Sequence, residues 1–182
     1  MKTGVFLERD GLLNAYDPKM GLKGAPVRVE HFKVNDSVRP FLDLLKSAGL
    51  ILIVTTNQPA ISRGLMSRNE LDMMHAILRR KLPVDEILMC PHDDPTHPCC
   101  KPQPGMFMEG AFKWGLDLDR SFVVSDKWQD AKAAQIVGCT SVLIDSPHIG
   151  NDHHDFVVPD FATAAKKILQ LHSQQFSVAA SA

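Results

Sequence analysis

Short apolar runs alternate with amphipathic segments along the whole chain, and this alternation limits the possible folds more than any other feature. Residues 50–56 form a β-branched run that is typical of a strand buried on both faces. Ser67 and Glu70 then match the capping box that opens a helix, which we expect to end near Lys81. Because this order repeats, the chain is predicted to form an α/β fold: a three-layer, doubly wound, mostly parallel sheet with helices on both faces.

The other strands and helices are predicted from the same periodicities. Expected strands cover residues 5–7, 85–89, 121–125 and 140–144, and expected helices cover residues 36–48, 104–115, 128–137 and 160–172. The 182 residues suffice for one domain with a sizeable core. We therefore expect a single domain over residues 1–173 and a flexible tail over residues 174–182.

Composition argues against several classes of partner. The formal net charge is −1, whereas nucleic acids and anionic membrane surfaces select strongly basic faces. No apolar run reaches the roughly 18 residues that a membrane span requires. The apolar stretch near the N-terminus covers only residues 4–7, which is too short for a signal peptide. We expect a monomeric, cytoplasmic protein with neither nucleic acid nor membrane as its partner.

In a doubly wound sheet, ligands bind beyond the carboxyl ends of the strands, so the residues there are the candidates for function. Glu8 and Asp10 follow the first strand. One residue separates them, so both carboxylates lie on the same side of the chain before Gly11 permits a turn. Two such acids are either a catalytic pair or solvated turn residues.

Two further segments offer groups that can bind phosphate. Thr56, Asn57 and Gln58 end the second strand with a hydroxyl and two amides, and Arg63 follows close enough to reach the same phosphate. Lys101 is held just before a helix start by a proline-rich turn, as a point charge for a phosphate. The alternatives are an ordinary polar loop and a solvated lysine.

A third segment places Asp126 at a strand end and Asp130 four residues later. Carboxylate oxygens suit Mg²⁺, which keeps most of its waters and takes one or two carboxylates together with the substrate phosphate. The alternative is an N-terminal helix acid with a partner in the first turn.

In order and spacing, these four segments resemble the four motifs of the haloacid dehalogenase superfamily. The closest likeness is to the subfamily of heptose bisphosphate and histidinol phosphate phosphatases, and it is carried by residues 6–11, 56–58, 101–102 and 126–127. The resemblance spans residues 5–144 and leaves no room for a large cap domain. It implies a Mg²⁺-dependent phosphatase of a small phosphorylated metabolite, with a sugar phosphate in carbohydrate metabolism as the favoured substrate.

The resemblance also implies a role for each matching residue. Glu8 stands at the nucleophile position, Asp10 is the general acid/base, and Lys101 stabilises the charge on the phosphate. The remaining positions bind phosphate (Thr56, Asn57, Gln58 and Arg63) or form and support the Mg²⁺ site (Glu8, Asp10, Asp126 and Asp130).

Glu8 is the main departure from the family, which has an aspartate there. The extra methylene moves the carboxylate oxygens by roughly 1.5 Å, and a misplacement of about 1 Å can cost about 10²-fold in rate. We expect Glu8 to ligate Mg²⁺ but to attack phosphorus poorly. One alternative is a non-catalytic relative that binds a phosphorylated ligand, and another is an engineered Glu8 that traps substrate.

Two features bear on the substrate. Heptose enzymes often have an arginine just before the motif lysine, whereas this chain has Cys100, which removes a possible phosphate contact. Residues 15–32 contain two glycines, two prolines and several basic residues, and we expect them to cover the mouth of the site.

Three of the four cysteines fall within residues 90–100, a density that in a reducing compartment indicates metal ligands or reactive thiols before disulfides. Cys90 and His92 form one pair of ligand types, and His97 and Cys99 form another, so together they can close a tetrahedral zinc site. The resemblance implies a structural zinc loop here, with His97 replacing a usual cysteine. A loop with unrelated thiols is the alternative.

Overall fold

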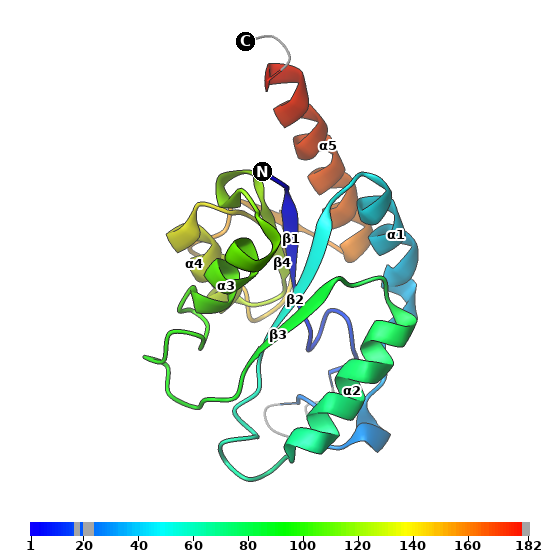
Figure 1. Ribbon diagram of the computed structural model, residues 1–182, viewed down its shortest axis with the longest axis vertical. Helices are drawn as coiled ribbons and strands as arrows, with labels where there is room; N and C mark the ends of the chain where they lie inside the picture. Colours follow the sequence, from blue (N-terminus) through cyan, green and yellow to red (C-terminus); the bar gives the residue numbers. More distant parts are fainter. Residues whose placement is uncertain (17–18, 20–23, 180–182) are drawn as a thin grey trace.

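The computed structural model describes residues 1–16, 19 and 24–179. Six parallel strands form one sheet in the order β3-β2-β1-β4-β5-β6 (Figure 1). This confirms the predicted α/β class with a parallel sheet. The strands are β1 (Gly4–Glu8), β2 (Ile51–Asn57), β3 (Glu86–Cys90), β4 (Phe122–Ser125), β5 (Thr140–Ile144) and β6 (Phe156–Val158).

Helices cover both faces of the sheet, so the predicted three layers are present (Figure 1). On one face lie α3 (Gly105–Trp114) and α4 (Trp128–Val137), and on the other lie α1 (Arg39–Ser47), α2 (Arg68–Lys81) and α5 (Phe161–Ala179). Ser67 caps α2 as expected, since its side chain accepts a hydrogen bond from the Glu70 N–H. The Glu70 carboxylate accepts the Val29 N–H at 2.7 Å, so the other half of the predicted capping box is replaced by a contact to the segment before α1.

The strands β1 to β4 are mostly apolar because each of them contributes to two hydrophobic cores. In β1, Val5 and Leu7 pack in the core beneath α1, α2 and α5, whereas Phe6 packs in the core beneath α3 and α4. Successive side chains of a strand point to opposite faces, so a strand covered on both sides needs apolar residues at every position.

Two elements differ from the sequence prediction. The strand β6 was not predicted, because it has only three residues and Val157 in its middle is 42% exposed, so no buried apolar run marks it. The helix α5 extends to Ala179 rather than ending near His172, and it therefore includes most of the expected tail. The glutamines at 174 and 175 are good helix formers, which explains the continuation.

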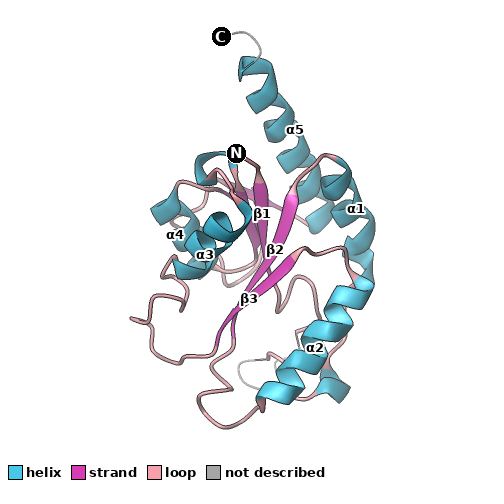
Figure 2. Cartoon of the chain, in the orientation of Figure 1, coloured by secondary structure: helices cyan, strands magenta, loops and turns pink. Residues whose placement is uncertain are grey.

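The order of the strands determines where this sheet can bind a ligand. β1 lies between β2 and β4, so the chain leaves β1 toward one side and later returns to its other side. This reversal is the topological switch point at which such folds bind ligands. The loops that follow the central strands gather at this carboxyl edge, which lies below the sheet in the view of Figure 2.

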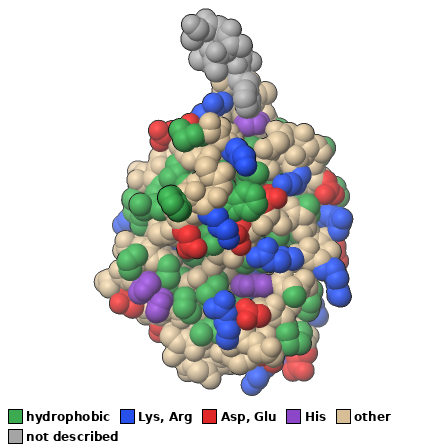
Figure 3. Space-filling model, in the orientation of Figure 1, with side chains coloured by type: hydrophobic (Ala, Val, Ile, Leu, Met, Phe, Trp, Pro, Cys, Tyr) green, Lys and Arg blue, Asp and Glu red, His purple; other side chains and the backbone are tan. Residues whose placement is uncertain are grey.

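The surface carries charges of both signs. On the face drawn in Figure 3, basic and acidic side chains are interspersed rather than separated by sign. Among the described residues, none of the helices combines the length and the apolar character that crossing a bilayer would require.

We predict that Gly110→Ala destabilises the fold, although alanine is the better helix former. A Cβ at Gly110 would lie 2.9 Å from the Phe6 ring and 3.1 Å from the Ile53 side chain, so α3 would have to move off the sheet. Overpacking of this kind costs about 1–3 kcal/mol. Chemical denaturation measures the change, and Ala111→Gly serves as the control for helix propensity. An equally or more stable Gly110→Ala variant would contradict the close approach.

Candidate active site

A cavity of about 390 Å³ opens at the carboxyl edge of the sheet. It lies where β1, β2 and β3 end and where α4 begins. Seven of the residues predicted from the sequence line it: Glu8, Asp10, Asn57, Gln58, Lys101, Asp130 and the expected zinc ligand His92. The edge of the sheet therefore brings together groups that are far apart in the chain.

Lys101 lies at the centre of this group. Its ammonium donates hydrogen bonds to the Glu8 carboxylate, to Asp130 Oδ1 at 2.6 Å and to the Thr55 carbonyl at 3.0 Å. Lys101 is only 4% exposed, so these acceptors replace the water that its charge has lost. Burial lowers the pKa of Lys101, but Asp130 and Glu8 outweigh it and hold the pKa above its ordinary value.

Glu8 turns its carboxylate back toward its own backbone. Its Oε1 accepts the N–H of Arg9 at 2.8 Å and that of Asp10 at 3.2 Å, while Oε2 accepts from Lys101. Burial would raise the pKa of Glu8, but Lys101 and Lys127 outweigh burial and lower the pKa to about 2. Glu8 is therefore fully ionised at neutral pH.

Asp130 comes from the first turn of α4 and supports Lys101. Its Oδ1 accepts from Lys101 and its Oδ2 accepts from Ser125 Oγ at 3.0 Å. Burial raises the pKa of Asp130 to about 6, because Lys101 only partly offsets the loss of water and Glu8 adds a nearby negative charge. The shared ammonium thus favours Glu8 as the more strongly ionised carboxylate.

Asp10 is held by donors from three directions. The Arg9 guanidinium forms an ion pair with it at 2.9 Å, Asn14 Nδ2 donates at 3.0 Å and Gln58 Nε2 donates at 2.7 Å. The Thr56 hydroxyl lies 3.4 Å from Asp10 Oδ2. The carboxylate assigned to acid/base chemistry is therefore fixed in one orientation.

Arg9 and His75 extend this arrangement to α2. Arg9 is fully buried, and its Nη1 lies 3.2 Å from His75 Nε2. Burial and the Arg9 charge together lower the pKa of His75 to about 4. His75 is therefore neutral at physiological pH and accepts a hydrogen bond from Arg9, and α2 is thereby linked to Asp10.

The residues predicted to bind phosphate have partners within the protein. Asn57 Oδ1 accepts the Lys101 N–H and its Nδ2 donates to the Lys101 carbonyl, both at 3.1 Å, so Asn57 holds the lysine loop. Arg63 forms an ion pair at 2.6 Å with Asp93, a residue that also lines the cavity. In this arrangement, Arg63 is directed toward Asp93.

Asp126 and Lys127 follow β4. The Lys127 ammonium donates to the Asp10 carbonyl and to Asp126 Oδ1, each at 2.5 Å. Burial lowers the pKa of Lys127, but the Glu8 and Asp126 charges raise it well above its ordinary value. An ammonium is thus held among the oxygens assigned to Mg²⁺, which shows that this set of donors fits a cation.

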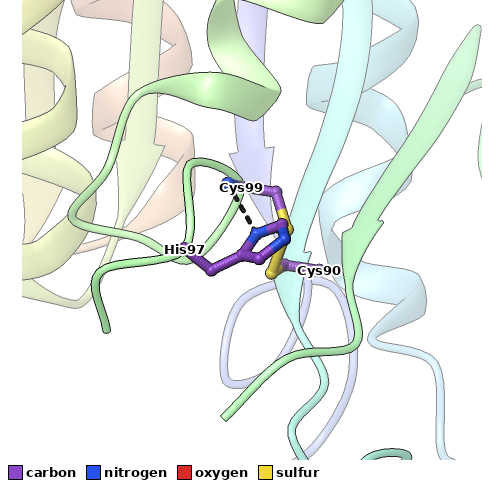
Figure 4. Close-up of side chains that lie close together, drawn as sticks. All are labelled: Cys90, His97 and Cys99. Atoms are coloured by element: carbon purple, nitrogen blue, oxygen red, sulfur yellow. Dashed lines mark hydrogen bonds between the residues drawn. A yellow bond between two sulfur atoms is a disulfide. The ribbon is translucent and has the colours of Figure 1, made fainter. Parts of the chain in front are cut away.

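The loop after β3 differs from the sequence prediction in one respect. Cys90 and Cys99 are joined by a disulfide, with their Cα atoms 5.4 Å apart, whereas the sequence favours metal ligands or thiols. The loop returns to the end of β3 and so brings the two residues within disulfide distance. His97 lies beside them, and its Nδ1 accepts the Cys99 N–H at 3.3 Å (Figure 4).

Three of the four predicted zinc ligands nevertheless lie together, and the fourth, His92, is adjacent to them. The ligand atoms of Cys90, His97 and Cys99 are all within 4.8 Å of one another. The His92 ring stacks on His97 with a centroid distance of 3.7 Å. Two sulfur and two imidazole donors in one loop are a suitable set for zinc when the thiols are reduced.

The mouth of the cavity includes part of the segment over residues 15–32. Tyr16, Ala25 and Val27 line it, which agrees with the expectation that this segment covers the site. Residues 17–18 and 20–23 of the segment lie outside the described residues.

Sequence reasoning assigned no role to Arg9, His75 or Lys127. A weak signal existed for Lys127, because a lysine directly after a strand-end acid lies at the same edge as the site. His75 carried no such signal, since only the packing of α2 brings it to Arg9.

We predict that His75 makes the fold sensitive to acid. Because its folded pKa of about 4 lies below its ordinary 6.5, the unfolded chain binds an extra proton between these values. Stability is therefore lost as the pH falls from 6.5 to 4, by about 3 kcal/mol. His75→Gln can still accept from Arg9 and should lack this dependence. Denaturant titrations across that range measure it, and identical pH slopes would refute the assignment.

Comparison with known proteins places this geometry in a family. A family model described as HAD-hydrolase-like matches residues 98–164. A D-glycero-β-D-manno-heptose-1,7-bisphosphate 7-phosphatase of Escherichia coli is 32% identical over 159 residues, which cover 77% of this chain and 78% of that protein. A relative of the same name from Pasteurella multocida is 29% identical over 95% of this chain and 100% of its own length.

A solved structure supports the same grouping. The D,D-heptose 1,7-bisphosphate phosphatase of B. bronchiseptica, complexed with magnesium and phosphate, superimposes with a TM-score of 0.78. It is 27% identical, and the match covers 92% of this chain and 98% of that one. With the sheet order, the edge carboxylates and the buried lysine, these likenesses have one explanation: the chain belongs to the haloacid dehalogenase-like hydrolases, among the phosphoric monoester hydrolases of that family.

Proposed function

We propose that this protein is a Mg²⁺-dependent phosphatase of a small sugar phosphate and that Glu8 makes it slow. The observation that carries the proposal is the buried Lys101–Glu8 ion pair beside Asp10 at the floor of the cavity. A carboxylate and an ammonium in contact, with a second carboxylate two residues away, are the groups needed to attack a phosphoryl group and to move a proton.

The size of the cavity and the similarity to named relatives support the proposed substrate class. A cavity of about 390 Å³ admits a small phosphorylated metabolite. The E. coli and P. multocida relatives carry the name of a heptose bisphosphate phosphatase. Cys100 lines the cavity where a cationic side chain would favour a second phosphate, so sugar monophosphates are included among the candidates.

Each step of the proposed reaction uses a group of this chain. A Glu8 oxygen attacks phosphorus, the bond to the leaving oxygen breaks, and Asp10 gives that oxygen a proton. Asp10 then takes a proton from a water molecule, whose oxygen attacks phosphorus and releases phosphate from Glu8. Lys101 offsets the negative charge on the phosphoryl oxygens throughout. Mg²⁺, held by Glu8, the Asp10 carbonyl and Asp126, would supply further positive charge next to the phosphoryl group.

The conformation of Glu8 supports slow turnover. One of its carboxylate oxygens accepts two backbone N–H groups and the other accepts Lys101, so these bonds stabilise the anion and weaken when its charge is lost on attack. A pKa of about 2 also marks a weakly basic oxygen. These same bonds favour the second candidate function, which is binding of a phosphorylated ligand without turnover.

Structural zinc in the loop after β3 is part of the proposal. The reduced thiols of Cys90 and Cys99, with His92 and His97, would hold the ion. Their clustering in one loop supports this assignment. Cys99 lies only two residues before Lys101. A zinc ion bound to Cys99 would therefore restrict the position of the Lys101 backbone.

Glu8→Asp is expected to raise the rate of phosphate release by about 10²-fold, because it restores the shorter nucleophile. The assay measures phosphate released from a panel of sugar phosphates and histidinol phosphate with Mg²⁺. Glu8→Gln is the control, since it keeps the size of the side chain but cannot form the covalent intermediate.

Each outcome of that assay decides between the candidate functions. Turnover by the Asp form alone shows a phosphatase site disabled by Glu8. Equal rates for wild type and Glu8→Asp would show that the extra methylene does not impair attack. Tight binding of the sugar phosphates without turnover by any form would favour the binding function.

We predict that protein purified under reducing conditions carries about one zinc ion per chain. Cys99→Ser should lose most of it and should unfold at a lower temperature, because the loop is no longer closed. Elemental analysis and thermal denaturation measure both effects. Cys100→Ser removes a neighbouring thiol outside the proposed set and should retain the metal. Zinc-free reduced protein would refute the site.

A further inference from the structure

Lys127 occupies a distinctive position in the site. It lies directly before α4, and its side chain turns back toward β1, where its ammonium contacts the Asp10 carbonyl and Asp126 Oδ1 at 2.5 Å each. The Lys127 side chain also lines the cavity and is 24% exposed. An ammonium with this position has water on one side and the acids of the site on the other.

The loop after β1 is shaped to allow this contact. Gly11 has a positive φ of 93°, and a Cβ there would lie 2.7 Å from Asp126 Oδ2 and 3.4 Å from Lys127 Nζ. A larger residue would therefore separate the Asp10 carbonyl from Asp126. The Lys127 N–H also donates to Ser125 Oγ at 3.1 Å, which fixes the start of the side chain. Contacts to Asp10, Asp126 and Ser125 thus hold Lys127 in place.

The charge of Lys127 matters because the site is crowded with acids. Glu8, Asp10, Asp126 and Asp130 converge here, and the cations bonded to them are Arg9, Lys101 and Lys127. Arg9 and Lys101 are buried. Arg9 forms its ion pair with Asp10, and Lys101 forms its ion pairs with Glu8 and Asp130. Lys127 is therefore the cation that neutralises Asp126.

A metal ion and this ammonium compete for the same oxygens. Mg²⁺ requires its ligand oxygens at about 2.1 Å in a near-octahedral arrangement. The Asp10 carbonyl and Asp126 Oδ1, which are among the oxygens proposed to hold the metal, already accept hydrogen bonds from Lys127 Nζ. Two positive charges at neighbouring oxygens repel each other, so the ammonium weakens binding of the metal as long as it stays there.

We propose that Lys127 is a resident competitor of the divalent cation: it balances the site in the absence of metal and is displaced into the cavity when the metal binds. This inference rests on the proposed use of Mg²⁺ at the site. Displacement moves a positive charge from the metal ligands to the side of the cavity where substrate enters. Metal binding and the supply of a free ammonium to an anionic substrate are thereby coupled.

The test compares metal binding by the wild type, Lys127→Met and Lys132→Met. The Met substitution keeps the apolar stem and removes the charge, and Lys132 is a matched lysine on the same helix. Calorimetric titration with Mg²⁺ and paramagnetic titration with Mn²⁺ should give dissociation constants at least about tenfold lower for Lys127→Met, because a competing positive charge has gone. Lys132→Met should match the wild type.

Stability provides the second readout of the same variants. In a chelator, Lys127→Met should unfold at a lower temperature than the wild type, and added Mg²⁺ should restore more of its stability than it adds to the wild type. Unchanged or weaker metal binding by Lys127→Met overturns the proposal. Because neither readout is turnover, an active phosphatase can fail this test and an inactive one can pass it.

A measurement on the wild type remains decisive if the variant does not fold. Nitrogen-15 labelled lysine should give a slowly exchanging ammonium resonance for Lys127, assigned through its own side-chain carbons. Saturating Mg²⁺ should shift this resonance and speed its exchange with water. A Lys127 resonance that stays unchanged while Mg²⁺ binds would overturn the proposal.

Discussion

The ammonium of Lys101, buried between the carboxylates of Glu8 and Asp130, is the interaction on which the rest of the site depends. A charge taken out of water is tolerated only when opposite charges and hydrogen bonds surround it. These partners come from β1, β2 and α4, so the ion pair joins the central strands to one helix layer. Asn57 then fixes the Lys101 backbone from both sides. Any displacement of the loop after β3 would leave two carboxylates without their shared cation.

The same electrostatics explain why the nucleophile position is both well ordered and poorly suited to attack. The longer side chain of Glu8 lets its carboxylate fold back onto two backbone N–H groups. Those donors and the two nearby lysines keep it ionised, as its low pKa indicates. An oxygen that is strongly stabilised as an anion gives up more on attacking phosphorus. Stability and reactivity therefore oppose each other at Glu8.

Much of the fold follows from local patterns. The capping box at Ser67 and the β-branched run before Asn57 each predicted their element to within a residue or two, because periodicity and capping act over short distances. β6 escaped prediction, since a short edge strand is stabilised by pairing with β5 and not by its own pattern. The helix α5 ran past its expected end because no residue near His172 stops it.

The sequence by itself determined which chemical groups reach the active edge. The strands are parallel, so their carboxyl ends meet, and Glu8, Lys101 and Asp130 had to lie near one another. Only the tertiary structure decided which charge pairs with which. Lys127 contacts the Asp10 carbonyl 117 residues away, and Arg9 meets a histidine 66 residues away on α2. Spacing along the chain carries no information about such partners, because they are selected by how whole helices pack on the sheet and by the energy of burying each charge.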